Sequence, residues 1–183
     1  MNEELIIAGF GGQGVLSMGK ILAYSGIMQD QEVSWMPSYG PEMRGGTANC
    51  TVIVSDDPIG SPVVDNPNEL IVMNIPSLIK FENKVVKNGI IFINSSVVDR
   101  EPERNDVDIV KIPANDIADK IGSVRVANMV VLGAYIAKTN AIKLETVLEA
   151  LRKKLEGKSE ELLILNEKAI KEGMKYLNSH IHV

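Results

Sequence analysis

The sequence is poor in the side chains that most often carry metal, redox or nucleophilic chemistry. It has one cysteine, Cys50, and two histidines, His180 and His182, in 183 residues. A single cysteine cannot form a disulfide within the chain or supply the four thiolates usual for an iron–sulfur cluster. Both histidines stand at the C-terminal end, where chains fray, so we expect neither a histidine-centred triad nor a buried zinc site.

Two residues, Cys50 and Ser17, could act as nucleophiles by type, but neither lies in the sequence context of a catalytic nucleophile. Cys50 lies in TANCTVIV, an apolar stretch that predicts a strand, so we expect a buried structural thiol. Ser17 follows a glycine cluster, but GQGVLS is not the G-x-S-x-G pattern of a hydrolase nucleophile. The chain therefore shows no active site of its own, and we expect the chemistry to belong to another chain.

The sequence also lacks a basic stripe and a long apolar run. Its net charge is −5, and its longest cationic run, Arg152 to Lys154, ends a predicted helix, where cations suit the helix dipole. Nucleic acid is thus not an expected partner. No apolar run approaches the ~18 residues of a membrane span, and the N-terminus has no basic leader region. We expect a soluble, cytoplasmic protein with no membrane partner.

What the chain does have is a regular alternation of short β-rich runs and helical patterns. This alternation predicts a Rossmann-like three-layer α/β fold, with a largely parallel sheet and helices on both faces. A length of 183 residues suits one domain, residues 1–183, ending in helices at about 144–179. Strands are predicted at Leu5–Ala8, Val33–Met36, Ala48–Val54, Leu70–Met73, Ile90–Ile93 and Asp108–Ile112. Helices are predicted at Val15–Gln29, Pro76–Val86, Asn115–Ile121, Val126–Thr139, Leu144–Leu155 and Glu160–Ser179.

A glycine motif lies between the first predicted strand and helix. Gly9, Gly11 and Gly14 match G-x-G-x-x-G in the context that such a motif needs. Backbone N–H groups at the start of a helix attract anions, and glycines let an anion approach closely. The same glycines would also serve a tight turn that binds nothing, so the motif alone leaves both interpretations open.

A dinucleotide site makes one further demand, and the sequence does not meet it. An acidic residue is needed at the end of the second strand to hold the ribose hydroxyls. That position reads WMPS, and the nearest acids, Asp30 and Glu32, precede the strand. Arg44 could accept a 2′-phosphate, but it lies well inside the next loop. NAD or NADP is therefore less favoured than another phosphate-bearing ligand.

The second candidate loop, PSYGPEMRGGT, lies between the second and third predicted strands. Such loops at the carboxyl ends of strands often build binding sites in α/β sheets. Arg44 has the geometry for a phosphate or carboxylate on a ligand or a partner chain, or it pairs with Glu42. Further along, VANMVVLGAYIA is apolar nearly all round, with Asn128 as its central polar residue, which predicts a helix in the core or partly in an interface.

These stretches together closely resemble one family. GFGGQGVLSMGKILA, SYGPEMRGGTANCTVIVSDDPIGSPVV and VANMVVLGA follow one another as in the gamma subunit of the 2-oxoacid:ferredoxin oxidoreductases. The likeness runs from about Glu4 to the helix at Val126. It implies an enzyme complex that oxidatively decarboxylates a 2-oxoacid, such as pyruvate, 2-oxoglutarate or a branched-chain 2-oxoacid, to acyl-CoA and CO2 while reducing ferredoxin.

The resemblance also implies how the work is divided in a hetero-oligomer. Thiamine diphosphate and the iron–sulfur clusters would belong to alpha and beta partners and a ferredoxin-like delta partner. The gamma chain, inactive alone, would contribute coenzyme A binding and subunit packing, with no metal and no catalytic residue. By resemblance, the cofactor-binding residues are Gly9, Gly11, Gly12, Gln13 and Gly14 in the first loop and Ser38, Tyr39, Glu42, Arg44, Gly45 and Gly46 in the second.

Three other functions remain open from the sequence. The chain also fits the small subunit of an indolepyruvate:ferredoxin oxidoreductase, whose single partner chain would hold both thiamine and clusters. Outside the family, it could be an independent NAD(P)-binding Rossmann protein or a scaffold that binds no ligand. In every case we expect the two loops to lie together at the carboxyl edge of the sheet.

Overall fold

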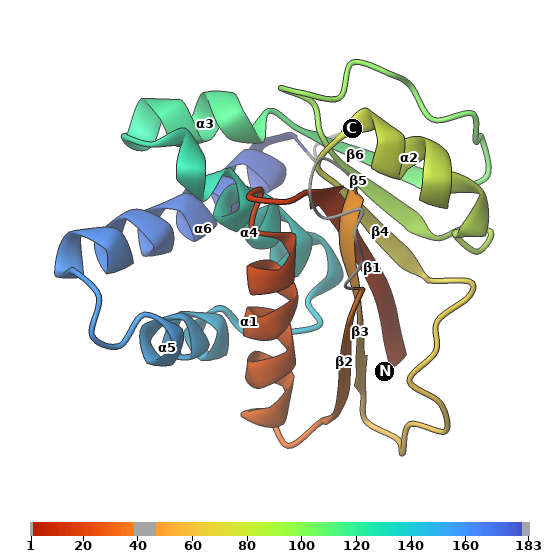
Figure 1. The fold of residues 1–183 in the computed structure, drawn as a ribbon, viewed down its shortest axis with the longest axis horizontal. Helices are drawn as coiled ribbons and strands as arrows, with labels where there is room; N and C mark the ends of the chain where they lie inside the picture. The colour runs from red at the N-terminus through yellow and green to blue at the C-terminus, as the bar shows by residue number, and fades with distance from the viewer. Residues whose placement is uncertain (1, 39–46, 181–183) are drawn as a thin grey trace.

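The computed structural model describes residues 2–38 and 47–180, which form an α/β structure around one sheet. Figure 1 shows the sheet between its layers of helices. The strands in the described residues are β1 (Asn2–Phe10), β2 (Glu32–Ser38), β3 (Thr47–Ser55), β4 (Glu69–Val72), β5 (Ile90–Asn94) and β6 (Asp108–Ile112). The helices there are α1 (Val15–Ile27), α2 (Ile75–Phe81), α3 (Ala114–Ile121), α4 (Ala127–Thr139), α5 (Leu144–Lys154) and α6 (Glu160–His180), with 3₁₀ turns η2 (Glu82–Lys84) and η3 (Val124–Val126). The predicted α/β class is confirmed.

The sheet has the order β2-β3-β1-β4-β5-β6 and is mostly parallel. Strands β1, β4, β5 and β6 pair in parallel, whereas β3 runs antiparallel between β1 and β2. Because β3 is antiparallel to both of its neighbours, β1 and β2 run in the same direction although they do not pair with each other. Their carboxyl ends therefore lie at one edge of the sheet, with the start of β3 between them.

The two faces of the sheet bury two apolar clusters, and successive residues of β1 alternate between them. Leu5 and Ile7 face the larger cluster, which α1, α4, α5 and α6 cover, while Ile6 and Ala8 face the smaller one. Helix α2 packs on the smaller cluster through Leu78. Figure 1 shows α2 on the opposite side of the sheet from α1, α4 and α6. Helices thus lie on both faces, as predicted, although the two layers are very unequal.

Helix α4 is the centre of the larger layer. Its residues from Ala127 to Ile136 are all buried, so the apolar run that the sequence placed in a core or an interface lies in the core. Helix α6 crosses it with almost no space between the two backbones. A Cβ built on Gly133 would stand 1.9 Å from the Ile170 carbonyl oxygen, and one on Gly173 would stand 1.9 Å from that of Val130. Two glycines therefore set the distance between α4 and α6.

One predicted helix is too long. The sequence predicted Pro76–Val86, but α2 ends at Phe81 and the chain continues as η2. The guanidinium of Arg104 donates to the carbonyl oxygens of Glu82 and Val85 at 3.0 and 2.9 Å. The Glu82 oxygen also accepts the Val85 N–H at 3.4 Å, in the 3₁₀ turn. The contact with Arg104 comes from a distant loop, so no local pattern indicates it. Among the described residues no helix combines the length and apolarity of a membrane span.

A buried carboxyl group stands at the start of β4. Glu69 is 3% exposed and accepts a hydrogen bond of 2.8 Å from the Tyr135 hydroxyl of α4. Burial raises the pKa of Glu69 to about 9, and the neighbouring carboxyl group of Glu3 acts in the same direction. At neutral pH the Glu69 carboxyl therefore stays protonated. It lies at the amino end of β4, the edge of the sheet opposite the glycine motif.

Glu69 predicts a pH-dependent stability. The folded protein holds this proton more tightly than the unfolded chain, so the contribution is full below the ordinary pKa of about 4.5 and is lost as pH rises toward about 9. Glu69→Gln keeps an acceptor for Tyr135 and carries no titratable proton. We expect its thermal midpoint to fall less than that of the wild type between pH 5 and 9. Equal slopes for the two proteins, or the same change in the exposed control Glu161→Gln, would contradict this assignment.

Candidate functional site

The glycine motif forms the turn from β1 into α1 and leaves the start of the helix open. Gly12 and Gly14 have φ values of 92° and 75°, in the left-handed region that favours glycine. Gly14 is the N-cap residue of α1, and no side chain caps the helix. The first N–H groups of α1 are therefore available to a bound anion.

The side chain of Gln13 fastens this turn to the sheet. Its Oε1 accepts a hydrogen bond of 2.7 Å from the Phe10 backbone N–H, and its Nε2 donates one of 2.8 Å to the Met73 carbonyl oxygen, just past β4. A Cβ on Gly9 would stand 2.7 Å from Gln13 Oε1 and 2.8 Å from Met73 Cβ. Both predicted binding residues, Gly9 and Gln13, thus position the turn in this structure.

Asn128 of α4 holds the other end of the turn. Its Nδ2 donates to the Gly14 carbonyl oxygen at 3.2 Å, and a Cβ on Gly14 would stand 2.3 Å from the same nitrogen. Sequence reasoning noticed Asn128 only as the polar residue in an apolar helix. A polar residue in an apolar helix was the signal that could have indicated this contact, because a buried amide needs a hydrogen-bond partner.

Two hollows lie on either side of the glycine turn. The first, of about 330 Å³, opens over the start of α1 and is lined by Phe10, Gly11, Gly12, Gly14, Val15, Leu16, Ser17 and Ala48. The second, of about 230 Å³, lies toward α4 and is lined by Gly12, Gln13, Met73, Asn115, Val124, Arg125, Ala127 and Asn128. Gly11, Gly12 and Gly14 thus line one or both hollows, as a close approach of ligand to backbone requires.

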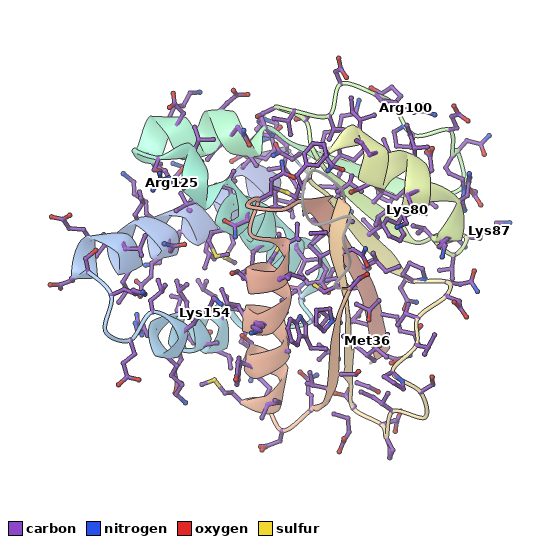
Figure 2. The ribbon with its side chains drawn as sticks, in the orientation of Figure 1. Met36, Lys80, Lys87, Arg100, Arg125 and Lys154 are labelled. Atoms are coloured by element: carbon purple, nitrogen blue, oxygen red, sulfur yellow. The ribbon has the colours of Figure 1, made fainter. Side chains whose placement is uncertain are left out.

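Arg125 brings a cation to the second hollow. It belongs to η3, the 3₁₀ turn before α4, where Ser123 Oγ accepts a 3.3 Å hydrogen bond from the Arg125 N–H. The side chain is exposed and makes no ion pair with any other described residue. Figure 2 labels it beside α3, where the chain passes toward α4. Sequence reasoning missed Arg125, since no motif links it to a turn more than a hundred residues earlier.

The ends of the second loop lie at the same edge of the sheet as the glycine turn. Phe10 at the end of β1 pairs with Thr47, and Ser38 at the end of β2 pairs with Asn49. Ser38 is exposed there. The remaining predicted residues of this loop lie outside the described part of the chain: Tyr39, Glu42, Arg44, Gly45 and Gly46.

Cys50 and His180 lie where the sequence predicted them, in a strand and at the end of the last helix. Burial raises the pKa of the Cys50 thiol to about 12, so it stays protonated and fits the predicted structural role. His180 ends α6, where its ring stacks on Tyr176 with 4.1 Å between ring centres, and His182 lies outside the described residues. In residues 2–38 and 47–180, no three His, Cys, Asp or Glu side chains are grouped to hold a metal ion.

Comparison with known proteins decides the family. Residues 4–176 match the model of the pyruvate ferredoxin/flavodoxin oxidoreductase family. This chain belongs to that family. It is 39% identical to the ketoisovalerate oxidoreductase subunit VorA of Methanothermobacter thermautotrophicus over 176 residues, covering 96% of this chain and 36% of VorA. It is 36% identical to the 2-oxoglutarate synthase subunit KorC of Methanocaldococcus jannaschii over 155 residues, covering 82% of each chain.

Two solved structures of the family share the fold. The gamma subunit of a keto/oxoacid ferredoxin oxidoreductase from Geobacter sulfurreducens has a TM-score of 0.82 and 27% identity, covering 97% of this chain and 99% of that one. The 2-oxoglutarate:ferredoxin oxidoreductase from Magnetococcus marinus, with 2-oxoglutarate, coenzyme A and succinyl-CoA bound, has a TM-score of 0.90 and 26% identity, covering 100% and 32%. The chain thus spans about a third of some relatives and the full length of others.

The two left-handed glycines predict different mutational costs. Alanine at Gly12 meets no atom within 4 Å and adds only backbone strain of about 1–2 kcal/mol, whereas alanine at Gly14 also meets the Asn128 amide. We expect Gly14→Ala to lower the free energy of unfolding, measured with urea, clearly more than Gly12→Ala. Adding Asn128→Ala should shrink the difference between them. Equal losses in both single variants would contradict the packing of Asn128 on Gly14.

Proposed function

We propose that this protein is the gamma subunit of a 2-oxoacid:ferredoxin oxidoreductase. Such a complex oxidatively decarboxylates a 2-oxoacid to acyl-CoA and CO2 and passes the electrons to ferredoxin. Family membership and the relatives named for ketoisovalerate and 2-oxoglutarate support this assignment. Those two acids and pyruvate are the candidate substrates. The isolated chain would be inactive, because the thiamine diphosphate and the iron–sulfur clusters would reside on partner chains.

The chain's own contribution would be to bind coenzyme A and to pack against its partners. The observation that carries this part is the uncapped start of α1 at a glycine turn between two hollows, with Arg125 lining one of them. Coenzyme A carries a pyrophosphate and a 3′-phosphate, so helix N–H groups and an arginine are suitable contacts. The Magnetococcus marinus relative holds coenzyme A and succinyl-CoA.

In this proposal Gly11, Gly12 and Gly14 admit the pyrophosphate to the N–H groups of α1, and Arg125 neutralises a phosphate oxygen. The second half of the site would consist of Ser38, Tyr39, Glu42, Arg44, Gly45 and Gly46. Their task would be to orient coenzyme A so that its thiol reaches the acyl group held by a partner chain.

Thiamine diphosphate and the iron–sulfur clusters would reside on alpha and beta partners, with a ferredoxin-like delta chain in some assemblies. One cysteine in 183 residues supports that division, because a cluster needs several thiolates. The complex would work in the cytoplasm. Where the partner is a single long chain, the same domain would serve as the small subunit of an indolepyruvate:ferredoxin oxidoreductase, and the neighbouring genes would distinguish the two assemblies.

The independent NAD(P)-binding alternative is less well supported. Glu32 begins β2 and Asp30 precedes it, so both acids lie at the edge of the sheet away from the glycine turn. The carboxyl end of β2 carries Ser38 where a ribose-binding acid would be required. Titration of the chain with NADH and NADPH tests this alternative, and micromolar binding of either would favour it.

The coenzyme A role predicts a specific kinetic effect. In the complex assembled with its alpha and beta partners, Arg125→Gln and Arg44→Ala should each raise the KM for coenzyme A by about tenfold, the loss of one charge-assisted phosphate contact. The kcat at saturating coenzyme A should change little. Arg152→Gln is the matched control, since Arg152 pairs with Glu167 on α6, and it should leave the KM unchanged.

Two results would refute the proposal. An alpha–beta assembly that makes acyl-CoA at the full rate without this chain would remove its role in the reaction. An unchanged KM for coenzyme A in both arginine variants, with the complex intact, would leave the chain a packing subunit only.

A further inference from the structure

A hollow between α1 and α5 lies apart from the glycine turn. It has a volume of about 370 Å³ and is lined by Lys20, Tyr24, Ala150, Lys153 and Lys154. None of these residues lines the two hollows beside the glycine turn. Hydrogen bonds join the end of α1 to the start of α5. Gln29 Oε1, just after α1, accepts from the Lys143 N–H at 2.8 Å and from the Thr146 hydroxyl at 3.0 Å.

The three cations from Arg152 to Lys154, which the sequence predicted at a solvated helix end, make different contacts. Arg152 pairs with Glu167 of α6 at 2.8 Å, and Lys153 pairs with Glu149 one turn earlier at 3.2 Å. Lys154 forms no ion pair with any described residue, and it lines the hollow instead. Figure 2 shows Lys154 between α5 and α1. Among the residues that the structure describes, one of the three cations is therefore not paired with a carboxylate.

Lys20 faces Lys154 from the other helix. Its Nζ stands 4.9 Å from the centre of the Trp35 ring, a cation–π contact that holds the amine near the hollow. Partial burial and the positive charge of Lys20 lower the pKa of Lys154. Like charges held together in a partly desolvated place cost free energy, and a bound anion would relieve that cost.

The other groups around the hollow add an aromatic wall and little negative charge. Tyr24 follows Lys20 by one turn of α1 and is 59% exposed, so its ring is open to contact. Lys153 pairs with the carboxylate of Glu149, one turn earlier on α5. The described residues that line the hollow include three lysines and no acid, in a chain whose net charge is −5.

We propose that this hollow is a second anion site, which binds a phosphate-bearing small molecule of the nucleotide class. Lys20 and Lys154 would contact the phosphates, and lysine is a common phosphate ligand in proteins. The exposed Tyr24 ring would stack on the base, as aromatic side chains do with nucleobases. Because it shares no residue with the glycine turn, the site stands apart from the coenzyme A role.

The test is calorimetric titration of the full chain with ADP and, separately, with inorganic pyrophosphate. Lys20→Gln and Lys154→Gln should each weaken both ligands by about tenfold, the usual effect of losing one charged contact. Tyr24→Ala should weaken ADP alone, because pyrophosphate has no base to stack. Lys80→Gln is the matched control, since the Lys80 amine also lies over an aromatic ring, 5.2 Å from the centre of Phe81 on the opposite face of the sheet.

The outcomes separate this site from the glycine turn. Loss of ADP binding in Lys20→Gln and Lys154→Gln, with binding kept in Arg125→Gln, supports the second site. Loss in Arg125→Gln alone would place ADP at the glycine turn and overturn the second site, while the proposed function would stand. No binding of ADP or pyrophosphate to the wild type would also overturn it.

Discussion

The amide of Gln13 is the interaction on which the site depends. By joining the Phe10 N–H to the Met73 carbonyl oxygen, it ties the turn after β1 to the end of the neighbouring parallel strand. Asn128 ties the far end of the same turn to α4. Two side-chain amides therefore hold the glycines in a left-handed path while leaving the first N–H groups of α1 uncapped. In the proposed function, a turn held in this way would offer these donors to an anion at a lower ordering cost than a loop that must fold on binding.

The antiparallel strand β3 decides what lies next to that turn. In a wholly parallel sheet the neighbour of β1 would present another helix start at this edge. Here the edge carries the ends of the 39–46 loop, because Phe10 pairs with Thr47 and Ser38 lies one strand further. The glycine turn and the two ends of the second predicted loop therefore lie at one edge of the sheet, where ligands bind in open α/β sheets.

Local pattern was enough to predict most of the fold, and it failed where contacts are long-range. Apolar periodicity located the strands and helices, since burial imposes it directly. It could not show the direction of β3, nor the early end of α2, after which Arg104 of a distant loop binds the carbonyl oxygens of Glu82 and Val85. In the site, the glycine motif was readable, whereas Arg125 and the contact of Asn128 with Gly14 depend on how α4 packs against the turn.

In the proposed function, the N–H groups at the start of α1 receive the pyrophosphate of coenzyme A. Amide hydrogen exchange, measured on the assembled complex with and without coenzyme A, tests it most directly. We expect slower exchange at Val15, Leu16 and Ser17 when coenzyme A is present, and no change at the equivalent first turn of α5. Unchanged exchange in the first turn of α1, at coenzyme A concentrations that saturate acyl-CoA formation, would contradict it.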